Sequence, residues 1–397
     1  MRILFLSQRV PFPPNRGDKI TTWRLIERLR RKHEVRVVAF AHDAGDIEAA
    51  GELARRGIPT VAVPHRDRFK RLTSLPLLAG GQPLTLGVYG SRRLQREVDA
   101  LVPQCDLAYA YSSSMGAFLE RHSALPRVMH FAELDSDKWR QYAERSRGPL
   151  RWVYAREQRT LLAFETRVAR AFDENVFCTP LEAEIFQRAV PGASSLVLRN
   201  GVDLEHFAPA PERVEPGHIV FTGVMDYLPN TDGCEWFVRE ILPLVRRRHP
   251  AARFSIVGSR PNAKVLALAQ VDGVQVTGFV PETRDWLARA AVSVAPLRIA
   301  RGIQNKVLEA MAMGLAVVGT TQATQGVDGV AERDFLVADD AQAFADAVVR
   351  LLDAPEAARE LGRRARRFVE QNYDWEVVFR PLDDLVARLA PSAASRR

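Results

Sequence analysis

Residues 1–40 read MRILFLSQRVPFPPNRGDKITTWRLIERLRRKHEVRVVAF. The short apolar run Ile3–Ser7 is followed by a polar, proline-rich loop and then by a stretch with apolar residues at helical spacing. A second run, Val35–Phe40, is rich in β-branched residues. The order strand, loop, helix, strand is that of a parallel βαβ unit. This stretch therefore predicts an α/β fold with a parallel sheet.

The same alternation continues along the chain in two series. Residues 200–217 separate them and contain three prolines and two glycines, a composition typical of a connection between domains. The expected strands of the first series are Ile3–Ser7, Val35–Phe40, Pro59–Val63, Asp106–Ala110, Arg127–Phe131, Asn175–Cys178 and Leu196–Leu198. Those of the second are His218–Gly223, Arg253–Gly258, Val274–Val280, Val292–Pro296 and Ala316–Gly319.

Two facing, doubly wound, Rossmann-like domains with mostly parallel sheets are the predicted architecture. A chain of 397 residues is long enough for two such domains. We expect residues 1–199 to form the first domain and 200–375 the second, with a C-terminal helix at about 376–390 that packs back on the first. The longest helical pattern, about Lys138–Phe172, should break near Gly148-Pro149. Further helices are expected over Asp232–Arg247 and Ile303–Met313.

The net charge of +8 is concentrated in the first half. Residues 1–199 hold 32 basic and 22 acidic residues, whereas the remainder holds 24 basic and 26 acidic residues. This asymmetry indicates an anionic partner such as a nucleotide or a membrane surface. Only six of the 56 basic residues are lysines, so an arginine excess caused by codon usage is the alternative.

The composition and the start of the chain exclude several classes of protein. Three widely separated cysteines without a C-x-x-C pair give no disulfide framework and no zinc site. No apolar run reaches the roughly 18 residues of a membrane span, and the first apolar run is too short for a signal peptide. Nucleic-acid-binding signatures are missing from the sequence. We expect a cytoplasmic protein without a cofactor or metal, with any membrane contact peripheral.

The strongest local signal for chemistry is the run PLRIARGIQNKVLEAMAMGLAVVG at 296–319. A strand ends at Pro296, a loop with cationic residues follows, and a helix opens after Gly302. Ligands of open α/β sheets bind at such carboxyl ends, and helix amides with Arg298 and Lys306 suit a diphosphate. Glu309, on the same helix face as Lys306, could accept hydrogen bonds from a ribose diol, or could form an intrahelical salt bridge with Lys306.

In the first domain, Gly17 stands at the junction of a loop and a helix, where main-chain N–H groups can approach a phosphate. An ordinary turn is the alternative. Asp135 and Asp137 form a D-x-D sequence before Trp139. We interpret both as helix-capping or acceptor-side groups and not as metal ligands.

These motifs together resemble family 4 of the retaining glycosyltransferases. The resemblance rests on Asn200–Phe207, Phe221-Thr-Gly223, Ile256-Val-Gly258, Gly278-Phe-Val280 and Gly302…Lys306…Glu309…Gly314, in this order across most of the chain. The surroundings of Trp139, Pro229-Asn230 and Arg298–Gly314 are further similar to the sugar transferases of PEP-CTERM and exosortase exopolysaccharide loci. The resemblance implies a GT-B fold, with the donor held mainly by the second domain and the acceptor by the first.

Site residues follow from the resemblance. Glu309 would bind the donor ribose and Lys306 would lie near the diphosphate, with Gly17 in the phosphate-facing loop of the first domain. The loop and helix start would add donor contacts from Gly302, Gln304 and Asn305. The family's usual second glutamate, eight positions before Glu309, is replaced by Arg301, which could instead contact phosphate or an acidic sugar.

His130, at the end of an expected strand, matches the place where the family often has an active-site histidine. It would orient the sugar or carry a proton. A hydrogen-bonded histidine without a catalytic role is the alternative. With Arg298 and Lys306, His130 completes the predicted catalytic set.

The predicted function is transfer of a hexose, with retention and without a metal, from a nucleotide-diphosphate sugar to a glycan or polyprenyl-diphosphate-linked acceptor in exopolysaccharide biosynthesis. A nucleotide-sugar epimerase of GT-B fold and a non-catalytic nucleotide-sugar-binding scaffold are the alternatives. The basic and apolar segments Arg66–Leu72 and Arg151–Arg156 would allow contact with the anionic inner face of the cytoplasmic membrane, or would be solvated helix faces.

Overall fold

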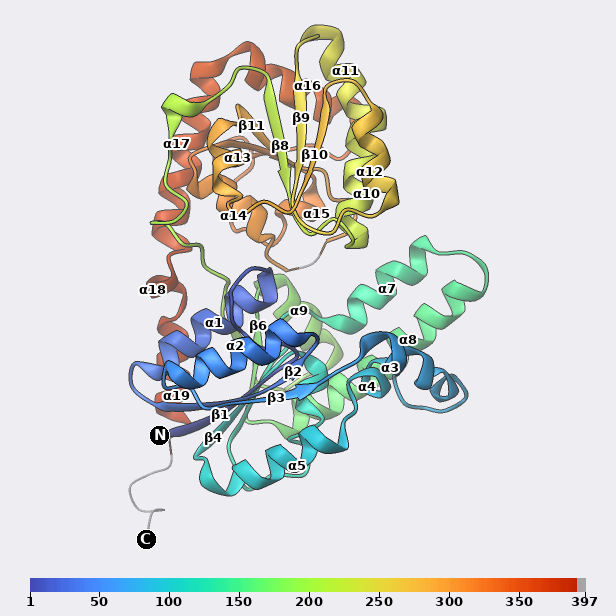
Figure 1. Ribbon diagram of the computed structural model, residues 1–397, viewed down its shortest axis with the longest axis vertical. Helices are drawn as coiled ribbons and strands as arrows, with labels where there is room; N and C mark the ends of the chain where they lie inside the picture. The colour runs from blue at the N-terminus through green and yellow to red at the C-terminus, as the bar shows by residue number, and fades with distance from the viewer. Residues whose placement is uncertain (301, 391–397) are drawn as a thin grey trace. The chain divides into compact units, whose positions relative to one another are not determined.

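The computed structural model describes residues 1–300 and 302–390, except for the side chains of residues 67, 68, 71 and 75. The chain divides into two compact units (Figure 1). Unit 1 comprises Met1–Arg199 together with the chain from Phe379 onward, and unit 2 comprises Asn200–Val378. Each unit has a parallel sheet of its own, which confirms the predicted α/β class.

The sheet of unit 1 has seven strands in the order β3-β2-β1-β4-β5-β6-β7. Every adjacent pair is parallel, and Phe5 of β1 lies beside Val37 of β2 and Tyr109 of β4. The strands are near-continuous apolar runs because parallel sheets are covered on both faces. Their bounds are β1 Arg2–Ser7, β2 Glu34–Ala41, β3 Thr60–Pro64, β4 Leu107–Tyr111, β5 Arg127–His130, β6 Glu174–Phe177 and β7 Leu196–Val197.

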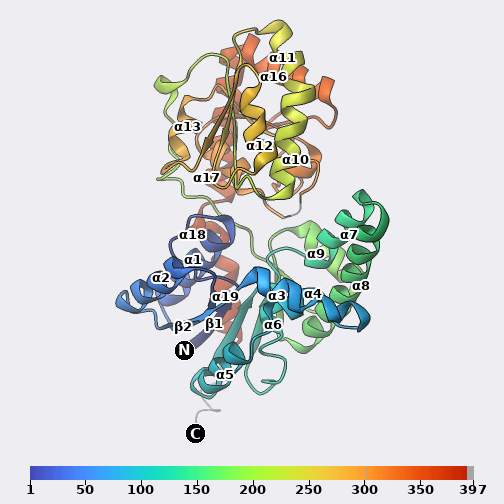
Figure 2. The ribbon, with the colours of Figure 1, turned by 45° about the vertical axis from the view of Figure 1, so that its right-hand side comes forward.

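Helices cover both faces of this sheet. One face packs Leu4, Leu6 and Phe40 into a buried cluster with Phe164 and Val168 of α8. Side by side in Figure 2, α7 and α8 form a hairpin. The helices are α1 Gly17–Arg30, α2 Ala44–Arg55, α3 Asp67–Thr73, η1 Leu75–Ala79, α4 Leu84–Tyr89, α5 Arg92–Leu101, η2 Val102–Gln104, α6 Ser113–Gly116, α7 Asp135–Arg145, α8 Gly148–Ala171, α9 Pro180–Ala189 and α19 Arg380–Arg388.

The sheet of unit 2 repeats the pattern with six parallel strands in the order β10-β9-β8-β11-β12-β13. In both sheets the strand order therefore runs outward in one direction, returns to the centre and continues in the other. This is the doubly wound topology. The bounds are β8 His218–Thr222, β9 Arg253–Val257, β10 Val274–Gly278, β11 Val292–Ala295, β12 Ala316–Gly319 and β13 Leu336–Val337.

Two helical layers enclose the second sheet (Figure 1). Helices α10, α11, α12 and α16 lie on one side, and α13, α14 and α17 lie on the other. The helices of unit 2 are η3 Pro211–Arg213, α10 Leu228–Trp236, the π-helical segment η4 Phe237–Ile241, α11 Leu242–Arg248, α12 Ala263–Ala267, η5 Leu268–Gln270, α13 Arg284–Arg289, α14 Asn305–Ala312, α15 Thr321–Thr324, α16 Ala341–Asp353, α17 Pro355–Asn372 and α18 Trp375–Val378.

The helix expectations compare closely with the structure. The predicted break at Gly148-Pro149 is confirmed, since α7 ends at Arg145 and α8 starts at Gly148, whose φ of +61° suits a residue without a Cβ. The helix expected at Asp232–Arg247 is instead three consecutive segments from Leu228 to Arg248. Helix α19 is tied to unit 1 by Arg28, which donates to the Asp383 carboxylate at 3.1 and 2.8 Å.

Candidate functional site

The carboxyl edge of the second sheet contains the switch point of its topology. There β8 and β11 are neighbours, and the chain leaves them toward opposite faces of the sheet. Loops after the two strands lead into α10 and α14, respectively. Ligands of open α/β sheets bind at this place, because neighbouring loops diverge and leave helix N-termini accessible.

Lys306 occupies the first turn of α14 at this edge. Its Nζ donates to Asn230 Oδ1 of α10 at 2.6 Å and lies 4.7 Å from the ring centroid of Phe221, in β8. Asn230 is itself buried and donates to the Val224 carbonyl at 2.8 Å, so its side chain is fixed from both ends. Partial burial lowers the pKa of Lys306 to about 8.

Gly223, directly after β8, makes this arrangement possible. A Cβ at this position would meet Asn230 Nδ2 at 2.7 Å, closer than van der Waals contact. The glycine in the Phe221-Thr-Gly223 motif is therefore required by packing against Asn230.

Glu309 follows one turn after Lys306 on α14. Burial raises the pKa of its carboxyl to about 7, and the nearby Lys306 charge opposes this shift. Because Lys306 Nζ is bonded to Asn230, the intrahelical salt bridge is not the contact that fixes the lysine. The start of α14 thus presents an amine and a carboxyl, and burial disfavours the charged form of each. A polar ligand that bonds to them would stabilise the charged forms.

Arg298, in the loop after β11, is held by an acidic partner from α10. Its Nε and Nη2 donate to the Asp232 carboxylate at 3.0 and 2.6 Å, and its guanidinium lies 5.5 Å from the ring centroid of Trp236. The hydrogen bond with Asp232 raises the pKa of Arg298. An anion at this loop therefore competes with Asp232 for the guanidinium.

The loop that leads into α14 is built around close backbone contacts. Gly302 has φ +64°, and a Cβ on Gly326 would lie 2.2 Å from the Gly302 carbonyl oxygen. Gln304 is the N-cap position of α14, and Asn305 Oδ1 accepts from Asn200 Nδ2 at 3.3 Å. Arg301 lies outside the described residues.

In unit 1, Gly17 is the first residue of α1 and is exposed. The first turn of this helix also carries Asp18, which forms ion pairs with Arg16 at 2.6 Å and Arg9 at 3.4 Å. Any phosphate at Gly17 would therefore lie beside a carboxylate that two guanidinium groups neutralise.

His130 ends β5 and is fully buried. Its Nδ1 is hydrogen bonded to the Tyr109 hydroxyl at 2.8 Å, and its Nε2 lies 3.6 Å from Cys178 Sγ. Burial lowers the pKa of the imidazole to about 3. A neutral ring with both nitrogens occupied fits the hydrogen-bonded histidine without a catalytic role, and this geometry gives the proton-carrier interpretation no support.

Asp135 and Asp137 lie in the first turn of α7, but neither caps it. Asp135 accepts from Ser113 Oγ at 2.8 Å and from Lys138 Nζ at 2.7 Å, and Asp137 accepts from Arg140 Nε at 2.8 Å. The capping alternative is wrong, because glutamates from other helices bond to amides at this helix start, and the acceptor-side alternative stays a prediction. Glu182 of α9 accepts from the Leu134 N–H at 3.1 Å, and Glu165 of α8 accepts from the Ser136 N–H at 3.3 Å.

Sequence reasoning missed the residues that hold the predicted site together. Asn230, Asp232 and Asn200 were not among the predicted site residues, although each bonds to one of them. Signals were available for Asn200 and Asn230, because both lie in the stretches that carry the family resemblance, and a buried amide such as that of Asn230 requires partners.

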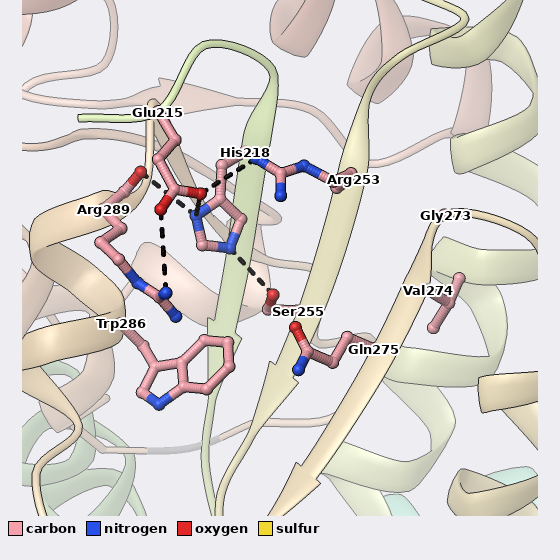
Figure 3. Close-up of a pocket in the computed structure, with 9 residues that line it drawn as sticks. All are labelled: Glu215, His218, Arg253, Ser255, Gly273, Val274, Gln275, Trp286 and Arg289. Atoms are coloured by element: carbon pink, nitrogen blue, oxygen red, sulfur yellow. Dashed lines mark hydrogen bonds and ion pairs between the residues drawn. The ribbon is translucent and has the colours of Figure 1, made fainter.

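A separate cavity of about 240 Å³ lies at the amino ends of β8, β9 and β10 (Figure 3). None of the predicted site residues lines it. The cavity and the Lys306 region therefore lie at opposite edges of the same sheet.

Comparison with known proteins shows which proteins have a sequence similar to this part of unit 2. Residues 216–354, which include Lys306, Glu309 and Arg298, match the family model described as glycosyl transferases group 1. Over this segment the chain is similar to group 1 glycosyl transferases. The epimerase and scaffold alternatives are not favoured.

Three similar proteins match this chain over nearly its whole length. An uncharacterized 44.6 kDa protein in the cps region of Klebsiella pneumoniae is 20% identical over 95% of this chain and 98% of its own. The structure of a sucrose-phosphate synthase from Thermosynechococcus elongatus has a TM-score of 0.75 at 19% identity, covering 98% of this chain and 99% of its own. HepE of Anabaena, in complex with UDP-glucose, has a TM-score of 0.72 at 14% identity, covering 98% and 100%. The GT-B fold is thereby confirmed.

Proposed function

We propose that this protein transfers a hexose from a nucleotide-diphosphate sugar to a glycan or a polyprenyl-diphosphate-linked acceptor. The observation that carries the proposal is the position of Lys306. It is a half-buried cation at a helix N-terminus, at the topological switch point of the sheet, within the segment that matches the family model. Such a cation is suited to bind a diphosphate, whose charge restores the ammonium form that burial disfavours.

Donor recognition would be divided among residues of unit 2. Lys306, Arg298 and the first amides of α14 would bind the diphosphate, and Glu309 would accept hydrogen bonds from the ribose. The remaining predicted donor contacts are Gly302, Gln304, Asn305 and Arg301, with Gly17 from unit 1. The complex of HepE with UDP-glucose supports a uridine nucleotide as the first donor to test.

In the proposed reaction, the bond between the anomeric carbon and the diphosphate oxygen breaks. The acceptor hydroxyl attacks the same face of the sugar, so the anomeric configuration is retained, and its proton passes to a leaving diphosphate oxygen. Lys306 and the helix amides would stabilise the charge that develops on the diphosphate. This chemistry requires no metal or other cofactor.

The proposal is tested with Lys306→Ala, matched by Lys264→Ala, an exposed lysine on the same unit. We expect Lys306→Ala to reduce nucleotide diphosphate release by 100-fold or more, the scale of removing one stabilising donor from a developing charge. Lys264→Ala should retain full activity. Turnover at the wild-type rate in a folded Lys306→Ala protein would overturn the assignment.

The acceptor dependence separates transfer from the alternatives. Release of nucleotide diphosphate that requires an extracted lipid or glycan acceptor supports transfer. Rearranged free sugar would identify an epimerase, and binding without turnover would identify a scaffold. We further propose membership of retaining family 4 and a role in exopolysaccharide biosynthesis, in line with the resemblance to PEP-CTERM-associated transferases.

An anionic membrane surface is the proposed location, on the inner face of the cytoplasmic membrane. No helix among residues 1–300 and 302–390 is long and apolar enough to cross a bilayer. Two helices of unit 1 instead expose large apolar side chains by more than half: Phe69 and Leu72 in α3, and Leu150 and Trp152 in α8. Exposed Arg66, Arg147 and Arg151 accompany them. Interfacial segments combine such apolar and basic residues.

Two buried residues of α8 bond to the chain that follows α3. Arg156 Nε donates to the Leu78 carbonyl at 3.0 Å, and the Glu157 carboxylate accepts from the N–H groups of Leu84 and Thr85 at 2.7 and 2.8 Å. Arg156, predicted to be part of the basic surface, is therefore structural. The side chains available for membrane contact are the exposed ones of α3 and of the first turns of α8.

Vesicle co-sedimentation tests the membrane proposal. Wild-type protein should bind vesicles containing anionic phosphatidylglycerol at low salt, and Trp152→Ser should bind at least fivefold more weakly. Phe279→Ser, which removes an exposed aromatic side chain from unit 2, is the matched control and should bind like the wild type. Protein that ignores anionic vesicles at low salt would leave codon usage as the explanation for the arginines.

A further inference from the structure

The cavity at the amino ends of β8, β9 and β10 contains groups that the proposed transfer reaction does not use. Strands of five residues separate it from the carboxyl edge, or about 16 Å of extended chain. Its walls are formed by Glu215, His218, Arg253, Ser255, Gly273, Val274, Gln275, Trp286 and Arg289 (Figure 3).

His218 fixes the direction of one hydrogen bond in this wall. Its side chain is buried, and its Nδ1 lies 3.1 Å from the Arg289 carbonyl, which can only accept. Nδ1 therefore donates to this carbonyl, and burial lowers the pKa of the ring, which favours the neutral form. Nε2 of the neutral ring accepts a hydrogen bond from the Ser255 hydroxyl at 2.8 Å. Ser255 Oγ therefore has lone pairs left to accept a hydrogen bond from a ligand.

Gln275 and Trp286 provide a polar and an aromatic wall. The Gln275 side chain extends from β10 toward the space between Ser255 and Trp286 (Figure 3). An amide both donates and accepts, as the hydroxyl groups of a sugar require. The indole of Trp286, beneath the Arg289 guanidinium at 4.3 Å from its ring centroid, offers an apolar surface of the kind that packs on C–H groups.

The carboxylate in the cavity wall is paired with both of the guanidinium groups there. Glu215 accepts from Arg253 Nη2 at 2.9 Å and lies 3.7 Å from Arg289 Nη1. A carboxylate held between two guanidinium groups offers a fixed acceptor to a hydroxyl group of a ligand. The volume of about 240 Å³ is below the roughly 300–1,000 Å³ of sites for drug-sized ligands, so the cavity suits a single small ring.

We propose that this cavity is a second carbohydrate-binding site, which holds one neutral pyranose ring of a glycan away from the site of transfer. The ring would bond to Gln275 and Ser255 and place its C–H face against Trp286. The site goes beyond the proposed function, since it binds sugar without reacting with it and neither a donor nucleotide nor Lys306 takes part.

Saturation-transfer NMR on the full-length protein tests the site with D-glucose, N-acetyl-D-glucosamine and D-glucuronic acid as probes. We expect transfer to at least one neutral sugar, also in the presence of saturating UDP. Gln275→Ala, an exposed position that is safe for folding, should weaken binding at least fivefold. Gln342→Ala, an exposed glutamine on α16, is the matched control and should bind like the wild type.

The site would be overturned by the absence of saturation transfer to either neutral sugar, by transfer that UDP abolishes, or by transfer that Gln275→Ala leaves unchanged. Preference for glucuronic acid with equal competition by sulfate would also overturn it, because it identifies an anion site. Lys306 takes no part in this cavity, so Lys306→Ala should bind the sugar like the wild type even where it no longer releases nucleotide diphosphate. The outcome is therefore independent of the test of the proposed function.

Discussion

Glu165 gives a prediction whose size can be calculated from the structure. The carboxyl is fully buried in α8, accepts the Ser136 N–H through Oε1 and has no partner at Oε2 within the described part of the chain. Burial, and secondarily the nearby charge of Asp135, raises its pKa to about 8. The folded protein therefore keeps a proton that the unfolded chain loses near pH 4.5.

A raised carboxyl pKa makes stability fall as the pH rises from about 4.5 to about 8, because only the unfolded state is free to ionise. The full slope is about 1.4 kcal/mol per pH unit, so the wild type should lose about 2.5 kcal/mol between pH 5.5 and 7.5 through this group. For a unit of this size that loss corresponds to roughly 5–10 °C in Tm.

Glu165→Gln keeps the acceptor for Ser136 and removes the ionisation. We expect calorimetry to show the Tm of unit 1 in Glu165→Gln rising relative to the wild type by about 5–10 °C between pH 5.5 and 7.5. Glu144→Gln, an exposed glutamate on α7, should show no such trend. A Tm difference between wild type and Glu165→Gln that is equal at both pH values would refute the reasoning.

Two further substitutions test the candidate site and its packing. Asp232→Asn frees the Arg298 charge from a partly exposed pair, so stability should change by less than about 1 kcal/mol while UDP binds severalfold more tightly in calorimetric titration. Weaker UDP binding would show that Arg298 needs its carboxylate to be positioned. Gly258→Ala places a Cβ 1.8 Å from the Gly223 carbonyl oxygen at φ +144° and should cost more than about 3 kcal/mol. Gly81→Ala, with no atom within 4 Å of the added Cβ, is its control, and equal Tm values for the two variants would contradict the packing argument.

Much of the fold could be predicted from local sequence. Buried parallel strands are apolar on both faces, so runs such as Ile3–Ser7 and Val35–Phe40 are recognisable without a partner strand. The short edge strand β13, Leu336–Val337, was missed because two residues carry no periodicity. Gly148-Pro149 marked a helix break because its cause is local.

The candidate site depended more on contacts between distant residues. Lys306 and Glu309 could be singled out because one helix carries both, but the partner of Lys306 is 76 residues away and that of Arg298 is 66 residues away. The same applies to α7, whose N-terminus is bonded by glutamates 29 and 48 residues further along the chain. A single sequence identifies a polar residue, but it does not indicate which distant residue forms its hydrogen bond or ion pair.

The two chain crossings between the units have a consequence for how the protein can be dissected. Val202, just after the first crossing, donates its N–H to the Tyr373 carbonyl at 2.8 Å, close to the second crossing at Val378. The two ends of unit 2 are therefore neighbours, as in a domain inserted into a host. Residues 200–378 could be excised with ends that a short linker would join. A fragment ending at Arg199, by contrast, would lack α19 and expose the surface that buries Leu382, Leu385 and Val386.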